Sequence, residues 1–319
     1  MTELKKIWTH IAGLEKSRRK SHALLKTIAR ELLYPPIYWF RANRHHVPGL
    51  DIQARIYKLG LKMLIMGKIG IVLSQRLLSS PMDSVRYFEF DFFRRRLVDH
   101  FKFADYLDIS SPRLLPLLVL QDFPETKAIL INPDVKDLNI TKKIFSSCGL
   151  DNRCSFLNEP IDRLYLTDNS FDLITSMSAV EHIPEEGDMS AVKKMWNLLS
   201  PNGRLLISVP CASEAFEEYT DYNEYGLLTP DENSYVLGQR FYDTRLLQDR
   251  FWNIIGRPAH MAVYGEKRSG IFFHNRHERL NSVDYPFWQE PYLMGLNYQN
   301  YDSIDDLPGI GVIAMEFIK

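Results

Sequence analysis

Residues 162–210 constrain the fold more than any other stretch, because they predict a strand, a helix and a second strand in immediate succession. Residues 171–176 and 205–209 are short apolar runs rich in strand-forming side chains. Residues 188–199 between them carry apolar side chains at helical intervals, and the Ser-Pro-Asn-Gly run at 200–203 ends that pattern. Since two parallel strands need a crossover connection, the stretch predicts neighbouring parallel strands in one α/β sheet.

The same stretch resembles a known family. Residues 168–173, 181–184 and 199–205 are similar, in order and spacing, to the fourth strand, fourth helix and fifth strand of class I S-adenosylmethionine-dependent methyltransferases. Weaker similarity extends from about Tyr87 to the C-terminus. The resemblance implies a doubly wound, mostly parallel, seven-stranded Rossmann-like sheet. It also implies S-adenosylmethionine as cofactor and methyl transfer as the reaction.

The resemblance further implies that the cofactor lies across the strand ends. The family has an acid and a glycine-rich turn after its first strand. Here residues 106–114 keep the acid as Asp108 but contain no glycine. Either Asn132 or Asp134 would hold the ribose hydroxyls, and Glu159 falls near the adenine position. The segment 81–103 corresponds to a lid over the cofactor, with Arg86, Tyr87 and Glu89 as its candidate residues. The predicted cofactor-binding residues are Asp108, Ser110, Ser111, Asn132, Asp134, Glu159 and Tyr87.

Methyl transfer from a sulfonium needs mainly alignment, and it needs a base only when the acceptor is a hydroxyl or a protonated amine. His182 follows the fourth strand and is the predicted catalytic base, with Glu181 as a residue that orients either it or the cofactor amine. The alternative is that this Glu-His pair shapes the pocket without touching the acceptor. No metal site is expected, because no His/Cys cluster has zinc spacing.

The charge is unevenly distributed along the chain. Residues 1–80 contain 15 Lys and Arg against 4 Asp and Glu, a net charge of +11, while the remaining residues carry −12.

Apolar side chains at helical intervals in 7–14 and 24–32 predict helix, interrupted at Tyr34-Pro35-Pro36, and a second helix is expected over 52–78. We therefore predict a basic helical extension at 1–80 and a methyltransferase-like domain at 81–319. The extension is either a cap on that domain or a surface for anionic lipid. Nucleic acid is not favoured, because no binding motif accompanies the charge.

Two insertions are expected within the domain. Residues 211–239 contain Tyr219, Tyr222, Tyr225 and Tyr235 among carboxylates and predict an acceptor-binding lid for a sugar or another flat molecule. The alternative is a loop that uses its tyrosines for packing. Residues 267–307 form an aromatic, weakly periodic excursion of unassigned role. Residues 260–264 and 310–318 are expected to form the last two strands, as an antiparallel hairpin at one edge.

Composition favours an enzyme-sized cytoplasmic protein. The 319 residues are 45% hydrophobic, and three cysteines are too few for a disulfide framework. No uninterrupted apolar region resembles a signal peptide. We predict O-methylation of a small-molecule or saccharide acceptor, in the context of polysaccharide biosynthesis, with peripheral contact at the inner membrane face. The alternative is a non-catalytic methyltransferase-like scaffold that has lost cofactor binding.

Overall fold

The fold is organised around one eight-stranded sheet with the strand order β10-β9-β11-β6-β5-β2-β3-β4. A computed structural model describes residues 4–11, 24–68, 70, 77–78, 82, 85–98, 103–223, 225–281 and 285–319. The strands of this sheet are β2 (Asp105–Ile109), β3 (Lys127–Ile131), β4 (Cys154–Leu157), β5 (Phe171–Met177), β6 (Leu199–Ala212), β9 (His260–Glu266), β10 (Tyr298–Tyr301) and β11 (Ile310–Ile318).

The predicted doubly wound, mostly parallel sheet is confirmed. Strands β4, β3, β2, β5 and β6 pair in parallel, whereas β11 runs antiparallel between β6 and β9. The sheet has eight strands rather than seven because β10, from the excursion at 267–307, adds to β9. The last two expected strands do pair antiparallel, but β10 and not their hairpin forms the edge.

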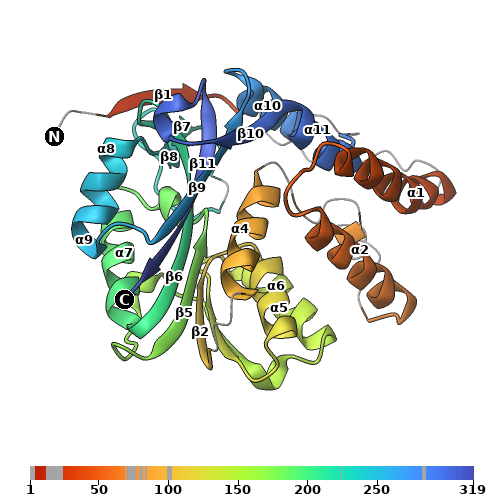
Figure 1. Ribbon diagram of the computed structural model, residues 1–319, viewed down its shortest axis with the longest axis horizontal. Coiled ribbons are helices and arrows are strands. Elements are labelled where there is room, and N and C mark those ends of the chain that lie inside the picture. The colour runs from red at the N-terminus through yellow and green to blue at the C-terminus, as the bar shows by residue number, and fades with distance from the viewer. Residues whose placement is uncertain are drawn as a thin grey trace.

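Helices cover both faces of the sheet, because each buried strand projects alternate side chains to opposite sides. Tyr106 packs into one apolar cluster with α4 (Arg86–Val98), α5 (Leu114–Asp122) and α6 (Val135–Ser147). Leu107 packs into the other. That second cluster contains α7 (Gly187–Leu198), α8 (Thr244–Leu247), a π-helical turn η4 (Gln248–Trp252) and α9 (Asn253–Ile255). Figure 1 shows α4, α5 and α6 on one side of β2, β5 and β6, and α7, α8 and α9 on the other.

A second sheet has the order β1-β7-β8, formed by β1 (Lys5–Thr9), β7 (Phe216–Thr220) and β8 (Val236–Phe241). The insertion at 211–239 therefore contributes a hairpin. The helix predicted around Ile7 is wrong, because this segment pairs in parallel with the edge of β7, from Lys5 opposite Phe216 to Thr9 opposite Thr220. Such long-range pairing overrides a short helical pattern.

The N-terminal region also contains two helices, α1 (Leu24–Asn43) and α2 (Leu50–Ile65). The predicted interruption at Tyr34-Pro35-Pro36 is wrong, since α1 continues through both prolines. Packing against α11 (Glu290–Asn297) and the short 3-10 helix η5 (Phe287–Gln289) supports it there. The second helix ends well before residue 78, at Ile65, where Gly67 has the left-handed φ of 63° that ends many helices. Residues 69 and 71–76 of the expected helix lie outside the described residues.

The excursion at 267–307 has structure of its own. It supplies α10 (Ile271–Asn281), η5, α11 and β10. In Figure 1, α10 and α11 lie between the second sheet and α1, so the excursion links the N-terminal helices to the rest of the molecule. Within the described part of the chain, no helix combines the length and apolar character that a membrane crossing requires.

Candidate active site

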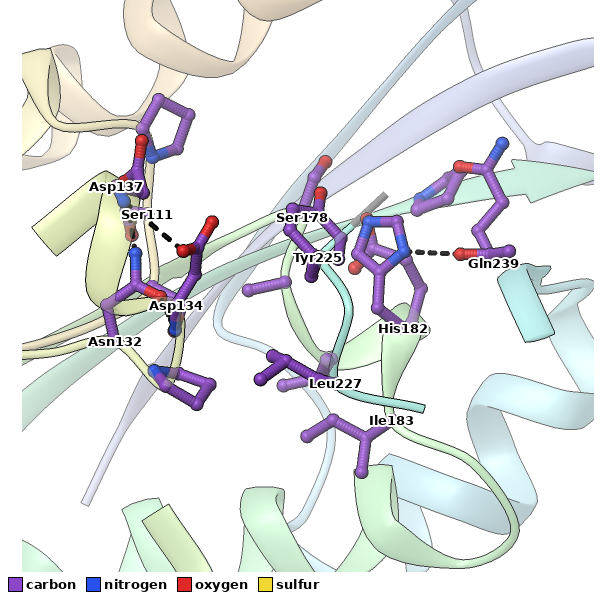
Figure 2. A pocket seen from close by; sticks show the side chains of 18 of the residues that line it. Ser111, Asn132, Asp134, Asp137, Ser178, His182, Ile183, Tyr225, Leu227 and Gln239 are labelled. Carbon is purple, nitrogen blue, oxygen red and sulfur yellow. Dashed lines mark hydrogen bonds and ion pairs between the residues drawn. The ribbon is translucent and has the colours of Figure 1, made fainter. Parts of the chain in front are cut away.

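The carboxyl ends of the parallel strands open into a cavity of about 1740 Å³. This is the edge at which open α/β sheets bind ligands. Figure 2 shows two groups of side chains facing each other across the space. One group, from the loops after β2 and β3, includes Ser111, Asn132 and Asp134. The other group surrounds His182 and includes Tyr225.

The turn after β2 keeps the backbone shape that a glycine would favour, although it contains serines. Ser110 has a φ of 53°, in the left-handed region. Its backbone N–H and its hydroxyl both donate to the carbonyl oxygen of Ile131, at 2.9 and 3.2 Å. The Ser111 hydroxyl accepts from the Met177 N–H at 3.0 Å. Hydrogen bonds thus hold a left-handed turn against the cavity, and both serines line it.

Asp108 lies beneath this turn rather than on the cavity wall. Its side chain is buried, and it accepts from the Ser111 N–H at 3.2 Å, the Tyr106 hydroxyl at 3.2 Å and the Thr175 hydroxyl at 2.7 Å. Burial raises the pKa of Asp108 to about 6, although these hydrogen bonds oppose the rise. The predicted cofactor-binding acid therefore supports the turn by a hydrogen bond from the protein interior and does not line the cavity.

The loop after β3 brings both candidate ribose ligands to the cavity, and the structure distinguishes their surroundings. Asp134 is the N-cap of α6 and accepts from the N–H groups of Lys136 and Asp137. Asn132 accepts from the Asp134 N–H at 2.9 Å and donates to the Asp137 carboxylate at 3.1 Å. Arg113 forms an ion pair with Asp137. Asn132 thus lies within a charged cluster that the sequence pattern did not reveal.

Glu159 and Tyr87, the remaining predicted cofactor residues, have opposite surroundings. Glu159 is exposed and lines the cavity after β4. Tyr87 is fully buried in the core, away from the cavity lining, and burial raises the pKa of its hydroxyl well above the usual value. Its neighbour Arg86 does line the cavity and pairs with Glu89 at 3.0 Å. The lid segment therefore presents Arg86, not Tyr87.

Glu181 and His182 lie together on a single 3-10 turn, η3 (Val180–His182), and both line the cavity. The His182 Nδ1 contacts the carbonyl oxygen of Gly238 on β8, and its Nε2 lies 3.8 Å from Glu181 Oε1. Burial lowers the pKa of His182 to about 4 and raises the pKa of Glu181 to about 8. Near neutral pH, the imidazole is therefore unprotonated and the Glu181 carboxyl is mostly protonated.

The wall around His182 comes from the two insertions. Tyr225 packs edge-on against the His182 ring at 5.4 Å between centroids, and Tyr222 also lines the cavity. Arg276 on α10 forms a buried ion pair with Glu218 on β7. Sequence reasoning missed Arg276, because no periodicity in its segment indicated which side chains would meet β7.

The cavity residues fit the cofactor that the resemblance implies. The left-handed turn brings backbone and hydroxyl groups to the cavity, and each of the next two strands ends in polar side chains that line it. A volume above the roughly 300 to 1,000 Å³ of common ligand pockets leaves space for an acceptor beside the cofactor.

Comparison with known proteins supports the resemblance to methyltransferases. Residues 113–207 match the family model of a methyltransferase domain. Phosphoethanolamine N-methyltransferase from Plasmodium falciparum (isolate 3D7) is 30% identical over 108 residues, covering 31% of this chain and 41% of that protein. The alignment thus spans less than half of the relative's length.

Several solved structures are similar at low identity. The [4+2]-cyclase SpnF is 16% identical with a TM-score of 0.48, over 72% of this chain and 79% of that one. The StiE O-MT, residues 961–1257, is 12% identical with a TM-score of 0.46, over 81% of each chain. Geranyl diphosphate C-methyltransferase from Streptomyces coelicolor A3(2), solved with S-adenosyl-L-homocysteine, is 8% identical with a TM-score of 0.46, over 76% and 78%.

The sheet order and the cavity at its carboxyl edge define a doubly wound α/β protein whose cavity lies at the edge where such sheets bind ligands. With the match of residues 113–207 to the methyltransferase-domain model, they confirm the predicted resemblance of this chain to class I S-adenosylmethionine-dependent methyltransferases. The family implies S-adenosylmethionine as the cofactor.

Proposed function

We propose that this protein transfers a methyl group from S-adenosylmethionine to a hydroxyl of a small-molecule or saccharide acceptor. The observation that carries the proposal is the setting of the His182 ring at the cavity. Its Nδ1 faces the Gly238 carbonyl oxygen, which can only accept, so Nδ1 holds the ring hydrogen. Nε2 then keeps a lone pair and can take a proton from an acceptor hydroxyl.

When bound, S-adenosylmethionine would supply an activated methyl group for the acceptor oxygen, and the electron pair of the broken carbon–sulfur bond would stay on its sulfur. His182 receives at Nε2 the proton that the hydroxyl loses. Glu181, with Oε1 3.8 Å from Nε2, is a positioning residue beside the ring and takes no part in the proton transfer. A positioned base of this kind contributes roughly 10²- to 10⁴-fold to a rate.

The residues for the cofactor are those at the strand ends. Ser110 and Ser111 present the turn, and Asn132 and Glu159 line the adjoining wall. Across the cavity, Tyr222 and Tyr225 offer ring faces, and Asn223 and Gln239 line the same space. Aromatic rings beside amide groups suit a sugar, which has apolar faces and hydroxyl edges. This pairing supports a saccharide acceptor.

Calorimetric titration with S-adenosylmethionine and S-adenosylhomocysteine tests the cofactor half. We expect the wild-type chain to bind both, and Glu159→Gln to weaken binding about tenfold, because the variant removes a carboxylate from the wall. Glu125→Gln, which changes an exposed carboxylate outside the cavity lining, is the matched control and should bind normally. Absence of binding to the wild-type chain would overturn the proposal and favour the non-catalytic scaffold.

The base is tested with labelled S-adenosylmethionine and a panel of hydroxylated acceptors, saccharides included. For any acceptor that is methylated, His182→Gln should lower kcat by about 10² or more, as expected for loss of a base. Affinity for S-adenosylhomocysteine should remain unchanged. A variant with wild-type kcat would show that the Glu-His pair only shapes the pocket.

A further inference from the structure

The outer face of α1 carries a continuous apolar stripe. Leu33, Ile37 and Phe40 are 61%, 48% and 56% exposed, and their spacing of four and three residues aligns them along the helix. Together with Pro36, Arg41 and Arg44, Ile37 and Phe40 line a shallow surface groove. We call the set Leu33, Pro36, Ile37, Phe40, Arg41 and Arg44 the α1 face.

The opposite side of α1 is fixed to the protein, so the α1 face cannot turn inward. Tyr34 contacts Trp288 with ring centroids 5.3 Å apart, and Tyr38 contacts Tyr292 at 6.2 Å. The Trp39 indole donates to the Leu50 carbonyl oxygen at 2.7 Å. Figure 1 shows α1 at the periphery of the molecule, beyond α11, with its outer side directed away from the sheet.

The charge around this stripe is positive. The segment 33–47 contains Arg41 and Arg44 and no Asp or Glu. The Arg44 guanidinium lies 5.0 Å from the centroid of the Phe40 ring, and that of Arg41 lies 5.0 Å from the Tyr38 ring. An apolar stripe bordered by arginines matches a helix that lies in the plane of an anionic bilayer, with its apolar side chains among the acyl chains.

We propose that the α1 face docks the protein on an anionic lipid bilayer. Ile37 and Phe40 enter the interface between headgroups and acyl chains, and Arg41 and Arg44 contact lipid phosphates. This assigns the predicted lipid contact to one face of one helix. The proposal is independent of the methyl-transfer reaction, because the α1 face lies outside the cavity lining.

Cosedimentation of the full chain with vesicles tests it. We expect binding to vesicles containing phosphatidylglycerol, much weaker binding to phosphatidylcholine alone, and weakening as salt rises. Phe40→Asp should abolish most binding. Tyr165→Asp, which changes a fully exposed aromatic residue on a loop elsewhere, should bind as wild type. Arg44→Gln should weaken binding to anionic vesicles about fivefold, the ratio that about 1 kcal/mol per basic residue corresponds to.

Circular dichroism and thermal unfolding check that Phe40→Asp remains folded, as expected for an exposed position. Failure of the wild-type chain to bind anionic vesicles at low salt would overturn the proposal, as would wild-type binding by folded Phe40→Asp. Analytical ultracentrifugation provides the competing outcome. If the chain dimerises in solution and Phe40→Asp dissociates the dimer, the α1 face is a self-association surface instead.

Discussion

At the scale of single residues, Glu181 has the most unusual setting in the cavity. Its side chain is 1% exposed, and within the described part of the chain its Oε2 has no hydrogen-bond partner. Burial raises the pKa of this carboxyl to about 8, from an ordinary value of 4.5. Between these two values the folded protein binds more protons at this site than the unfolded chain does, so this group lowers stability as pH rises.

We predict that Glu181→Gln stabilises the protein at alkaline pH, because the amide removes the cost of ionising a buried carboxyl. The gain should be on the order of a few kcal/mol above pH 8 and should vanish below about pH 3.5, where the carboxyl is protonated in both states. Thermal unfolding across a pH series measures it. Glu186→Gln, at an exposed position nearby, serves as the control. A gain that is equal at all pH values would contradict the titration of Glu181.

At the scale of elements, the turn after β2 has a left-handed backbone conformation although a serine, and not a glycine, occupies the position. Ser110 holds the left-handed conformation where the resembled family has glycine. Two hydrogen bonds to Ile131, one from the backbone and one from the hydroxyl, support it. Side chains with a Cβ disfavour this region by about 1 to 2 kcal/mol.

We therefore expect Ser110→Gly to be more stable than Ser110→Ala by about 1 kcal/mol. Both changes remove the hydroxyl, so their difference isolates the backbone conformation, and glycine's greater freedom in the unfolded chain reduces the gap. Urea unfolding of the pair provides the measurement. If Ser110→Ala is as stable as Ser110→Gly, the turn does not hold a left-handed residue in solution.

A buried ion network joins β8 to α7 beneath His182. Arg240 has no exposed surface and contacts Asp188 at 2.9 Å and Glu217 at 2.8 Å. It also donates to the carbonyl oxygens of Ile183 and Glu185. These contacts tie the second sheet to the turn that carries the predicted base, so the network positions one wall of the cavity.

We predict that Arg240→Leu costs about 3 to 5 kcal/mol, because Glu217 loses its ion pair with Arg240 and the buried Asp188 loses one of its two arginines, keeping Arg250 and the Tyr242 hydroxyl. Arg55→Leu breaks the partly exposed ion pair with Asp122 and should cost about 1 kcal/mol or less. Chemical denaturation of both variants gives the comparison. Equal losses would show that the Arg240 network is no more important than a surface pair.

At the scale of the whole molecule, the N-terminus and the excursion at 267–307 close the cavity from outside the parallel sheet. β1 covers the edge of β7, and Ile11 just beyond it lines the cavity. The side chains of β1 are mostly exposed. Its contribution is therefore mainly strand pairing, and Ile7 alone packs on the small apolar cluster that contains Phe216 and Phe241.

Deletion of residues 1–11 should leave the main sheet folded and lower the free energy of unfolding by about 1 to 3 kcal/mol, in proportion to the few cross-strand pairs lost. It should also promote self-association, because β7 becomes an unpaired edge. Thermal unfolding and size-exclusion chromatography measure the two effects. Complete loss of the folded state would show that β1 is part of the core.

Local patterns in the amino-acid sequence were enough to predict the parallel sheet and the edge at which it carries its cavity. Apolar runs separated by a helical pattern in 162–210 predict neighbouring parallel strands, and the carboxyl ends of such strands meet at one edge. The sheet follows from periodicity and strand direction, which are local properties of the chain. The resemblance to class I methyltransferases is what assigned Ser110, Asn132, Glu159 and His182 to this edge, and all four line the cavity.

Contacts between segments distant in the sequence determine which of these side chains face the cavity and which elements close it. Asp108 and Tyr87 were expected to contact the cofactor, as were their neighbours Ser110 and Arg86. Both side chains are instead buried and lie outside the cavity lining. The segment around Ile7 has a helical pattern but pairs with β7, more than 200 residues away. Arg276 meets Glu218 across two insertions. Each outcome depends on partners distant in sequence, and the free energy of pairing and burial with them exceeds local preference.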